Sequence, residues 1–189
     1  LAMSDRFPNL FSPFTIRNVE VRNRIFSSGH GTLLAAGNVT DELIAYQRAR
    51  AEGGAGLVVI EVASVHPTAL YNAHMLKVET DECIPGYRRL AEAVHGAGCK
   101  VFAQLFHPGR EILQSQDGSA TAAFAPSAVP NDRFHVMPRA MPREMVREVV
   151  ESYGDAARRM KEAGIDGAEI VASHGYLPSQ FLNPHANVR

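Results

Sequence analysis

The sequence EGGAGLVVIE, residues 52–61, decides the fold of this 189-residue chain. Its first glycines predict the end of a helix, because glycine accepts the left-handed backbone that closes a last helical turn. The apolar run at 57–60 has no alternation with polar residues, which is typical of a strand buried on both faces of a sheet.

The same pattern returns twice along the chain. HGAG at 95–98 precedes the apolar run 101–105, and EAGIDG at 162–167 leads into the run 168–171. A fourth run, 24–27, opens the series without a helix before it.

Helices are predicted between these runs. One begins after the capping residue Thr40, one begins near Pro85, and one follows Pro142. The resulting order β-α-β-α-β-α-β predicts parallel strands joined by right-handed crossovers.

Four such units fit either a small doubly wound sheet or half of an eight-stranded barrel. A nucleotide-binding open sheet should carry a phosphate fingerprint after its first strand, and the residues SSGHGT at 27–32 match neither common glycine motif. A barrel instead gathers its chemistry at the carboxyl ends of several strands, where polar side chains are then expected.

Composition excludes several classes of protein. The chain is 46% hydrophobic and 21% charged, which excludes disordered, collagen-like and coiled-coil sequences. Its net charge of −1 argues against a nucleic-acid or membrane-surface binder, and no apolar run approaches the roughly 18 residues of a membrane span. Cys83 and Cys99 cannot form a disulfide framework, and no signal-peptide core is evident, so we expect a reducing, cytoplasmic setting. Leu1 and Ala2, ahead of Met3, are expected to be a cloning remnant.

Polar residues gather where the predicted strands end. The histidines expected at this rim, one per strand, are His30, His66, His107 and His174. Glu61 and Arg110 are also expected near it, and the proline-rich stretch 108–142 is predicted to be a long βα loop that forms part of the pocket.

Two of these regions carry the sharpest chemistry. Gln104 lies within an apolar strand, where its amide must find partners or lose about 1–3 kcal/mol to desolvation, and an amide suits the edge of a flavin pyrimidine ring. His174 can serve as a base, as a hydrogen-bond donor to a substrate oxygen or as a metal ligand, and Tyr176 as a proton donor.

Taken together, the motifs resemble the flavin oxidoreductase family of old yellow enzyme, in the branch with 2,4-dienoyl-CoA reductase and trimethylamine dehydrogenase. The matching pieces are LFSP at 10–13, NRI at 23–25, GGAGL at 53–57, QLFHPGR at 104–110, HGYL at 174–177 and QFLNP at 180–184, with Asn187 and Arg189. They occur in the family's order over nearly the whole chain.

The resemblance implies an FMN-binding (β/α)8 barrel entered through an amino-terminal hairpin at about 14–21. It implies that Ser28, Gly29 and His30 lie along the flavin, and that Val62 and Ala63 lie near its ring. It also implies that Gln104 bonds the pyrimidine, that His174 faces the substrate and that Tyr176 donates a proton. No metal ligands are implied.

Two departures bear on the chemistry. Gly31 stands where trimethylamine dehydrogenase has its flavin-linking cysteine, so the resemblance implies a non-covalent FMN. Val171 replaces the first histidine of the carbonyl-binding pair of many ene-reductases. The substrate therefore stays open between an unsaturated carbonyl and an N-methyl amine, and NADH or NADPH is the expected electron donor.

The family barrel is about twice as long as this chain. We therefore expect residues 1–189 to be the amino-terminal half, about four βα units, of a single FMN-binding barrel domain, completed by the same gene product or a separate chain. A homo-oligomer is a further possibility. Two alternatives to a flavin enzyme stay open here: a metal-dependent barrel hydrolase using His30, His107 and His174 as zinc ligands, and a non-catalytic half-barrel that binds a partner.

Overall fold

A parallel sheet forms the centre of the chain in a computed structural model, which describes residues 3–112 and 122–189. Its main strands follow the order β3-β4-β6-β9, and each pairs with its neighbour in parallel. The strands are β3 (Phe26–Ser27), β4 (Leu57–Ser64), β6 (Lys100–Phe106) and β9 (Gly167–Ile170), with short β5 (Leu76–Lys77) added beside β4. The predicted parallel β-α-β order is confirmed.

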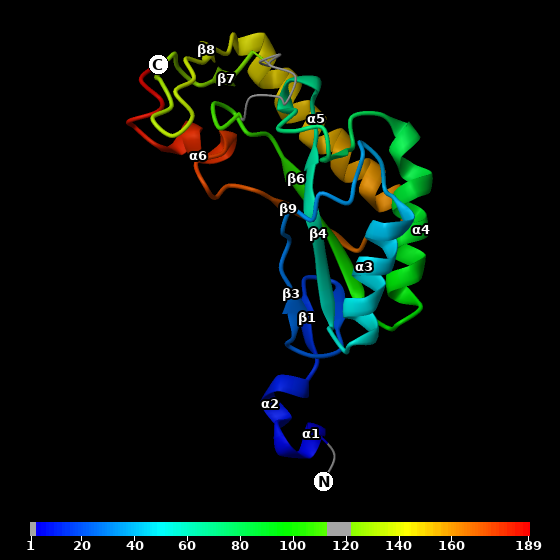
Figure 1. The fold of residues 1–189 in the computed structure, drawn as a ribbon. Coiled ribbons are helices and arrows are strands. Elements are labelled where there is room, and N and C mark those ends of the chain that lie inside the picture. Colours follow the sequence, from blue (N-terminus) through cyan, green and yellow to red (C-terminus); the bar gives the residue numbers. More distant parts are fainter. Residues whose placement is uncertain (1–2, 113–121) are drawn as a thin grey trace.

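Three long helices cover one face of this sheet (Figure 1). They are α3 (Asp41–Glu52), α4 (Ile84–His95) and α5 (Arg143–Glu162). Thr40 caps α3 by accepting a hydrogen bond from the Leu43 amide at 3.2 Å, as predicted. The glycines after these helices, Gly54, Gly98 and Gly164, have φ angles of 104°, 68° and 84°, so the predicted helix ends are confirmed.

The main hydrophobic core lies between the sheet and the three helices. Leu43 from α3, Leu90 from α4 and Met160 from α5 pack against strand residues such as Ile60 and Val101. Every one of these side chains is at most 1% exposed. This layer fixes the helices to the strands and so fixes where the strand ends point.

An antiparallel hairpin closes the amino-terminal end of the sheet, as predicted for residues 14–21. It consists of β1 (Phe14–Ile16) and β2 (Val19–Val21), and it covers Leu57 and Val59 on the face away from the helices. Arg22, just after β2, donates hydrogen bonds to the carbonyls of Ala51, Ala55 and Ala97 and so ties the ends of α3 and α4 together.

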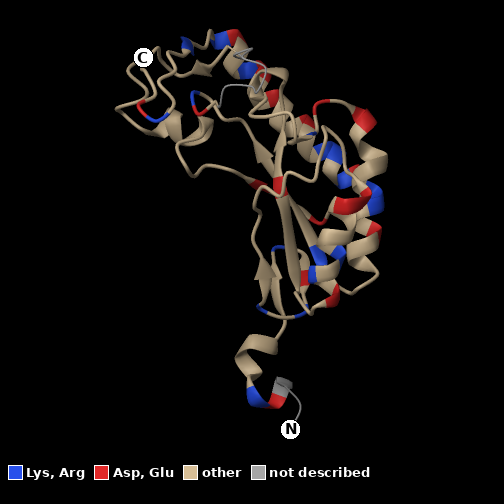
Figure 2. Cartoon of the chain, viewed as in Figure 1, with Lys and Arg blue, Asp and Glu red and all other residues tan. Residues whose placement is uncertain are grey.

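Charge is distributed unevenly over the molecule. Figure 2 shows Lys, Arg, Asp and Glu gathered on the three long helices, whereas the opposite side of the sheet carries few of them. In the described part of the chain, β3 and β9 each pair with a neighbour along one edge only. Ile170 at the end of β9 is 60% exposed.

The remaining elements lie outside the central layers. They are α1 (Met3–Arg6), α2 (Pro8–Phe11), the 3₁₀ turns Pro67–Ala69 and Asp81–Cys83, the parallel pair β7 (Phe124–Ala125) and β8 (Arg139–Ala140), and α6 (Leu177–Leu182). The predicted loop 108–142 therefore contains two short strands, and its residues 113–121 lie outside the described ranges. No helix over residues 3–112 and 122–189 is long and apolar enough to cross a bilayer.

Candidate active site at the strand ends

A cavity of about 420 Å³ opens at the carboxyl ends of the four main strands. Its walls combine residues of the strands themselves, such as Val62 in β4 and Gln104 in β6, with residues of the loops that follow the strands. The lining residues are Gly29, His30, Gly31, Leu33, Val62, Tyr71, Asn72, His74, Met75, Gln104, Val171, Ser173, His174 and Tyr176. Six of the eight residues assigned to cofactor or catalysis from the sequence are among them.

Gln104 and Gly29 meet on one wall of this cavity. A methyl group on Gly29 would overlap the carboxamide of Gln104, so glycine is what lets the loop after β3 approach that side chain. The Gln104 amide donates a hydrogen bond to Glu169 Oε1 at 2.8 Å, across the register that pairs the two residues. Gln104 is only partly buried, so the expectation of an isolated buried amide is corrected: Glu169 is its partner.

That pairing leaves Gln104 with further hydrogen-bonding capacity. A carboxamide has two N–H donors and a carbonyl acceptor, and Glu169 uses one donor. One N–H donor and the carbonyl acceptor of Gln104 therefore remain available at the cavity, and such a pair matches the edge of a ring that carries both an acceptor and a donor.

A bulge in β4 decides how Val62 and Ala63 are placed. The β4–β6 register shifts between Ile60 and Val62, so Val62 faces the cavity. Ala63 instead packs into the helix-facing core with no exposed surface, so it can reach the cavity only through its backbone. Ser28 is exposed and its side chain does not line the cavity either, so a contact of Ser28 or Ala63 with a ligand there would be made by backbone atoms.

Glu61 occupies the position of that bulge. It was expected after the strand, but it lies within β4 and is 2% exposed. One carboxylate oxygen accepts a hydrogen bond from the backbone amide of Thr32 at 2.6 Å. Glu61 therefore braces the loop after β3, which carries Gly29 and His30 into the cavity.

Of the four rim histidines, the structure brings only two to the cavity. His30 lines it and bonds the Tyr46 hydroxyl, and His174 lines it from the loop after β9. His66 and His107 are buried beneath, stacked with ring centroids 6.2 Å apart. His107 is thus not available to a zinc site with His30 and His174, and no group of three metal-ligating side chains occurs within the described ranges.

The backbone around His174 is left-handed at two successive residues. His174 has φ 56° and Gly175 has φ 77°. A positive φ is uncommon for a residue other than glycine, and this one turns the imidazole toward the cavity. A hydrogen bond of 2.7 Å joins Ser173 Oγ to His174 Nδ1, which leaves Nε2 of that ring for a ligand.

Tyr176 packs against an aromatic cluster at the cavity wall. Its ring meets Phe106 edge-to-face with centroids 4.6 Å apart, and Tyr71 stands 6.4 Å away. Burial, with a smaller contribution from Tyr71, raises the pKa of Tyr176 above its ordinary value. The phenol is therefore protonated at neutral pH and holds a proton that it can donate.

Several lining residues were missed by the sequence interpretation. Tyr71, Asn72, His74 and Met75 come from the loop after β4, where no motif marks them. Glu169, the partner of Gln104, was not predicted either, although a charged residue within the apolar run 168–171 was a detectable signal. That run was expected to form a buried strand, but Ala168, Glu169 and Ile170 are exposed along β9. The loop 108–142 was expected to form part of the pocket, but none of its described residues, 108–112 and 122–142, lines this cavity.

Comparison with known proteins decides the family. The model of the NADH:flavin oxidoreductase / NADH oxidase family matches residues 9–189. The chain belongs to this family. The resemblance predicted from the motifs is thereby confirmed, and with it the flavin cofactor class of the family.

The relatives of this chain have different names. It is 43% identical over 182 residues to a metal reductase of Desulforamulus reducens, covering 95% of this chain and 27% of that protein. It is 37% identical over 183 residues to an NADPH dehydrogenase of Bacillus subtilis, covering 95% of this chain and 53% of that protein. The chain thus spans about half or less of the length of these relatives.

Solved structures agree with the fold. An old yellow enzyme homologue from Zymomonas mobilis superposes with a TM-score of 0.84 at 27% identity, over 96% of this chain and 53% of that one. A 2-naphthoyl-CoA reductase gives a TM-score of 0.88 at 28% identity, over 96% and 30% respectively. The predicted half of a TIM barrel with an amino-terminal hairpin is confirmed.

The residues present fit a flavin. The cavity is lined by the backbone of Gly29 and Gly31, which have no side chain, and by the amide of Gln104, which has one hydrogen bond to Glu169. The space beside Gly31 is open, because a methyl group there would meet nothing within 4 Å. A flat ring needs such an open backbone on one side and a donor–acceptor pair at its edge.

Proposed function

We propose that the complete protein is an FMN-dependent oxidoreductase that transfers hydride between the flavin and NAD(P)H or a small substrate. One observation carries the proposal. The flavin-suited wall of Gly29 and Gln104 and the proton-donating Tyr176 line the same cavity at the strand ends.

The chain's own residues divide into two groups in this proposal. Gln104, Gly29, His30 and Val62 hold the cofactor with the backbone of Ser28 and Ala63, while His174 and Tyr176 face the substrate. The bound flavin supplies the hydride-transfer chemistry. His174 binds a substrate oxygen, and Tyr176 delivers a proton to the carbon skeleton.

Reduction of an unsaturated carbonyl is the direction that Tyr176 supports. A phenol whose pKa is raised stays protonated, and that is the state a general acid needs when a polarised double bond accepts hydride. Oxidation of an N-methyl amine needs no such donor. Val171 is apolar, 4% exposed and packed beside Phe106, so it cannot bind a substrate oxygen. His174 is then the imidazole that the segment after β9 offers to the substrate.

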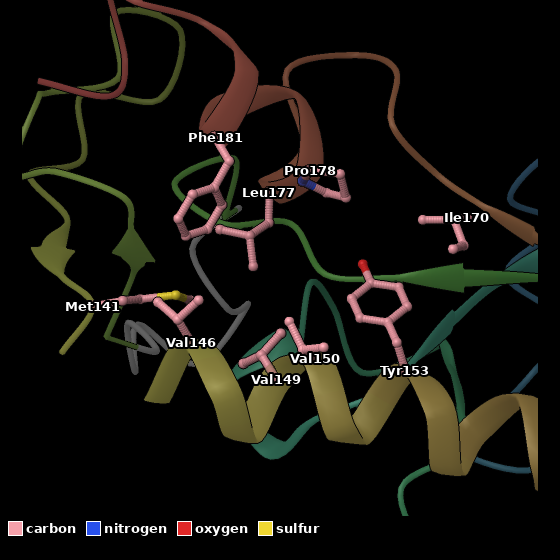
Figure 3. A pocket seen from close by; sticks show the side chains of 9 residues that line it. All are labelled: Met141, Val146, Val149, Val150, Tyr153, Ile170, Leu177, Pro178 and Phe181. Carbon is pink, nitrogen blue, oxygen red and sulfur yellow. The ribbon is translucent and has the colours of Figure 1, made fainter. Parts of the chain in front are cut away.

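We further propose that residues 1–189 are half of one barrel domain and that the remaining half is their partner, on the same gene product or on a separate chain. An apolar groove of about 390 Å³ lies between α5 and α6 beside the open edge of β9. Figure 3 shows side chains of α5 pointing toward those of α6 across it. Its lining residues are Met141, Val146, Val149, Val150, Tyr153, Ile170, Leu177, Pro178 and Phe181. Val150 is 65% exposed, and this chain covers 53% of the Bacillus subtilis relative, which therefore contains about as many residues again.

Flavin affinity tests the cofactor wall. In the complete protein, Gln104→Leu should raise the dissociation constant for FMN by about 5- to 150-fold, because lost polar contacts cost about 1–3 kcal/mol. Since this change also strips Glu169 of its partner, the double variant Gln104→Leu/Glu169→Leu serves as the control. An unchanged dissociation constant in both variants would show that Gln104 does not bind the cofactor.

Separated half-reactions test the catalytic wall. Tyr176→Phe should slow reoxidation of the reduced enzyme by an enone by about 10²–10⁴-fold, because the general acid is lost. Reduction by NADPH should stay near the wild-type rate, since it takes no proton from this residue. Stopped-flow absorbance measures both, and two unchanged rates would remove Tyr176 from the mechanism.

A further inference from the structure

The backbone on both sides of Tyr176 is held by hydrogen bonds, one from the Gln180 side chain on α6 and one to the His107 carbonyl in the loop after β6. The carbonyl of Gly175, just before it, accepts a hydrogen bond from Gln180 Nε2 at 2.6 Å. The amide of Leu177, just after it, donates to the carbonyl of His107 at 3.0 Å. The two residues next to Tyr176 are therefore both fixed by hydrogen bonds, and we call this pair of hydrogen bonds the bracket.

Gln180 forms the first half of this bracket. It lies on α6, is 2% exposed, and uses its single carboxamide for three bonds. Besides Gly175, its Nε2 donates to the Pro108 carbonyl at 3.0 Å, and its Oε1 accepts from the Arg110 amide at 3.2 Å. It thus joins the loop after β6 to the loop after β9.

Gly109 makes room for this amide. It adopts φ 63°, and a methyl group there would overlap the carboxamide of Gln180. Gly109, in the motif HPGR at 107–110, and Gln180 on α6 therefore form one packing unit. Neither residue lines the cavity, so the unit acts through Tyr176 rather than on a ligand.

His107 forms the second half of the bracket, and its hydrogen bonds set its tautomer. The Gly109 amide donates to Nδ1 at 3.0 Å, so Nδ1 carries no proton and the neutral ring keeps one on Nε2. Nε2 donates to the hydroxyl of Thr68 at 3.0 Å. His107 is fully buried, and burial, helped by His66, lowers its pKa to about 3.

The chain of bonds continues from Thr68 to the surface. The Thr68 hydroxyl donates to His66 Nδ1 at 2.7 Å, which also accepts the Thr68 amide at 3.2 Å. His66 therefore carries its proton on Nε2, which lies 3.2 Å from the exposed carboxylate of Glu148 on α5. His66 Nε2 makes no hydrogen bond and only lies near that carboxylate, but both ring nitrogens of His107 have a hydrogen-bond partner, so the His107 ring has one orientation.

We propose that Gln180 and His107 are positioning residues that aim the Tyr176 hydroxyl at the reacting carbon. The inference rests on the proposed role of Tyr176 as proton donor. Phe106 completes the bracket, because it precedes His107 and carries the edge-to-face contact with the Tyr176 ring. Loss of the bracket lets that ring tilt, and a misplacement of about 1 Å costs a catalytic group about 100-fold in rate.

The test uses the complete flavin-loaded enzyme and the two half-reactions. Gln180→Leu should slow reoxidation by an enone about 10- to 100-fold and leave reduction by NADPH near wild type. His107→Asn, which keeps an acceptor for Gly109 and loses the bond to Thr68, is the second variant and should slow reoxidation about tenfold. Gln47→Leu is the matched control, because Gln47 is also buried (3% exposed) but contributes nothing to the cavity lining.

A double-variant comparison separates positioning from general damage. In a Tyr176→Phe background, Gln180→Leu should have no further effect on reoxidation, because the hydroxyl it aims is absent. A slowing that persists in that background overturns the inference. So does a wild-type reoxidation rate in Gln180→Leu while Tyr176→Phe alone is slow.

Two measurements do not depend on turnover. Hydrogen exchange at the Leu177 amide should quicken in Gln180→Leu and stay unchanged in Gln47→Leu, and equal exchange in all three proteins overturns the bracket. Ultraviolet titration of the phenol should show a lower pKa for Tyr176 in Gln180→Leu, as its ring becomes more exposed. If Tyr176→Phe reoxidises normally while the Leu177 amide responds as expected, the proposed function has failed and the bracket is structural.

Discussion

Acidification should destabilise this protein through one buried imidazole. Burial, together with the neighbouring His66, lowers the pKa of His107 from 6.5 to about 3. The folded state therefore excludes a proton that the unfolded chain binds below about pH 6.5. The free energy of unfolding is unaffected by this group above that pH and falls as pH drops from about 6.5 to about 3.

The magnitude follows from the two pKa values. Between pH 7 and pH 5 the unfolded chain gains most of one proton at this site while the folded protein gains almost none. The linkage relation gives a loss of about 2 kcal/mol over that interval, and about 5 kcal/mol once both states are protonated.

The assay is urea unfolding of the complete protein followed by circular dichroism. We expect the wild type to lose about 2 kcal/mol more than His107→Asn between pH 7 and pH 5, because asparagine does not titrate there. Other titrating groups cancel in this difference. His185→Asn, a change at an exposed histidine, should reproduce the wild-type pH dependence. Equal pH dependence in wild type and His107→Asn would refute the argument.

Three further outcomes follow from individual contacts. Gly29→Ala should weaken FMN binding at least tenfold in a fluorescence titration, because the added methyl overlaps Gln104, and Gly29→Ala/Gln104→Ala should recover part of the loss. Arg22→Ala should lower the free energy of unfolding by about 2 kcal/mol through loss of charged hydrogen bonds to helix-end carbonyls, and Arg22→Lys should lower it less. Thr40→Ala should cost about 1 kcal/mol by removing the cap of α3, whereas Thr40→Ser should stay close to wild type.

The sequence alone predicted the order and direction of the main elements. A helix end at Gly54 and a doubly buried strand at 57–60 depend on local backbone preference and local apolar patterning, which short stretches already contain. The parallel sheet then follows from the alternation of helices and strands. The motif from Gln104 to Arg110 and the motif around His174 were enough to predict the family that the comparison confirms.

Only the tertiary structure decided which predicted residues meet. His66 and His107 have the same place after a strand as His30 and His174, yet they are buried beneath the cavity in a row of hydrogen bonds. The bulge at Glu61 turns Ala63 away from the cavity, and a single inserted residue of this kind leaves no mark in a local pattern.

Pairings between distant residues were also beyond the sequence. Glu169 meets Gln104 because β6 and β9 are in a particular register, and Gln180 reaches the loop after β6 because α6 folds back over it. Backbone preferences act over a few residues, whereas these contacts join positions 65 and 70 residues apart. Such contacts exist only once packing has set β6 beside β9 and has brought α6 and the loop after β6 to the same end of the sheet.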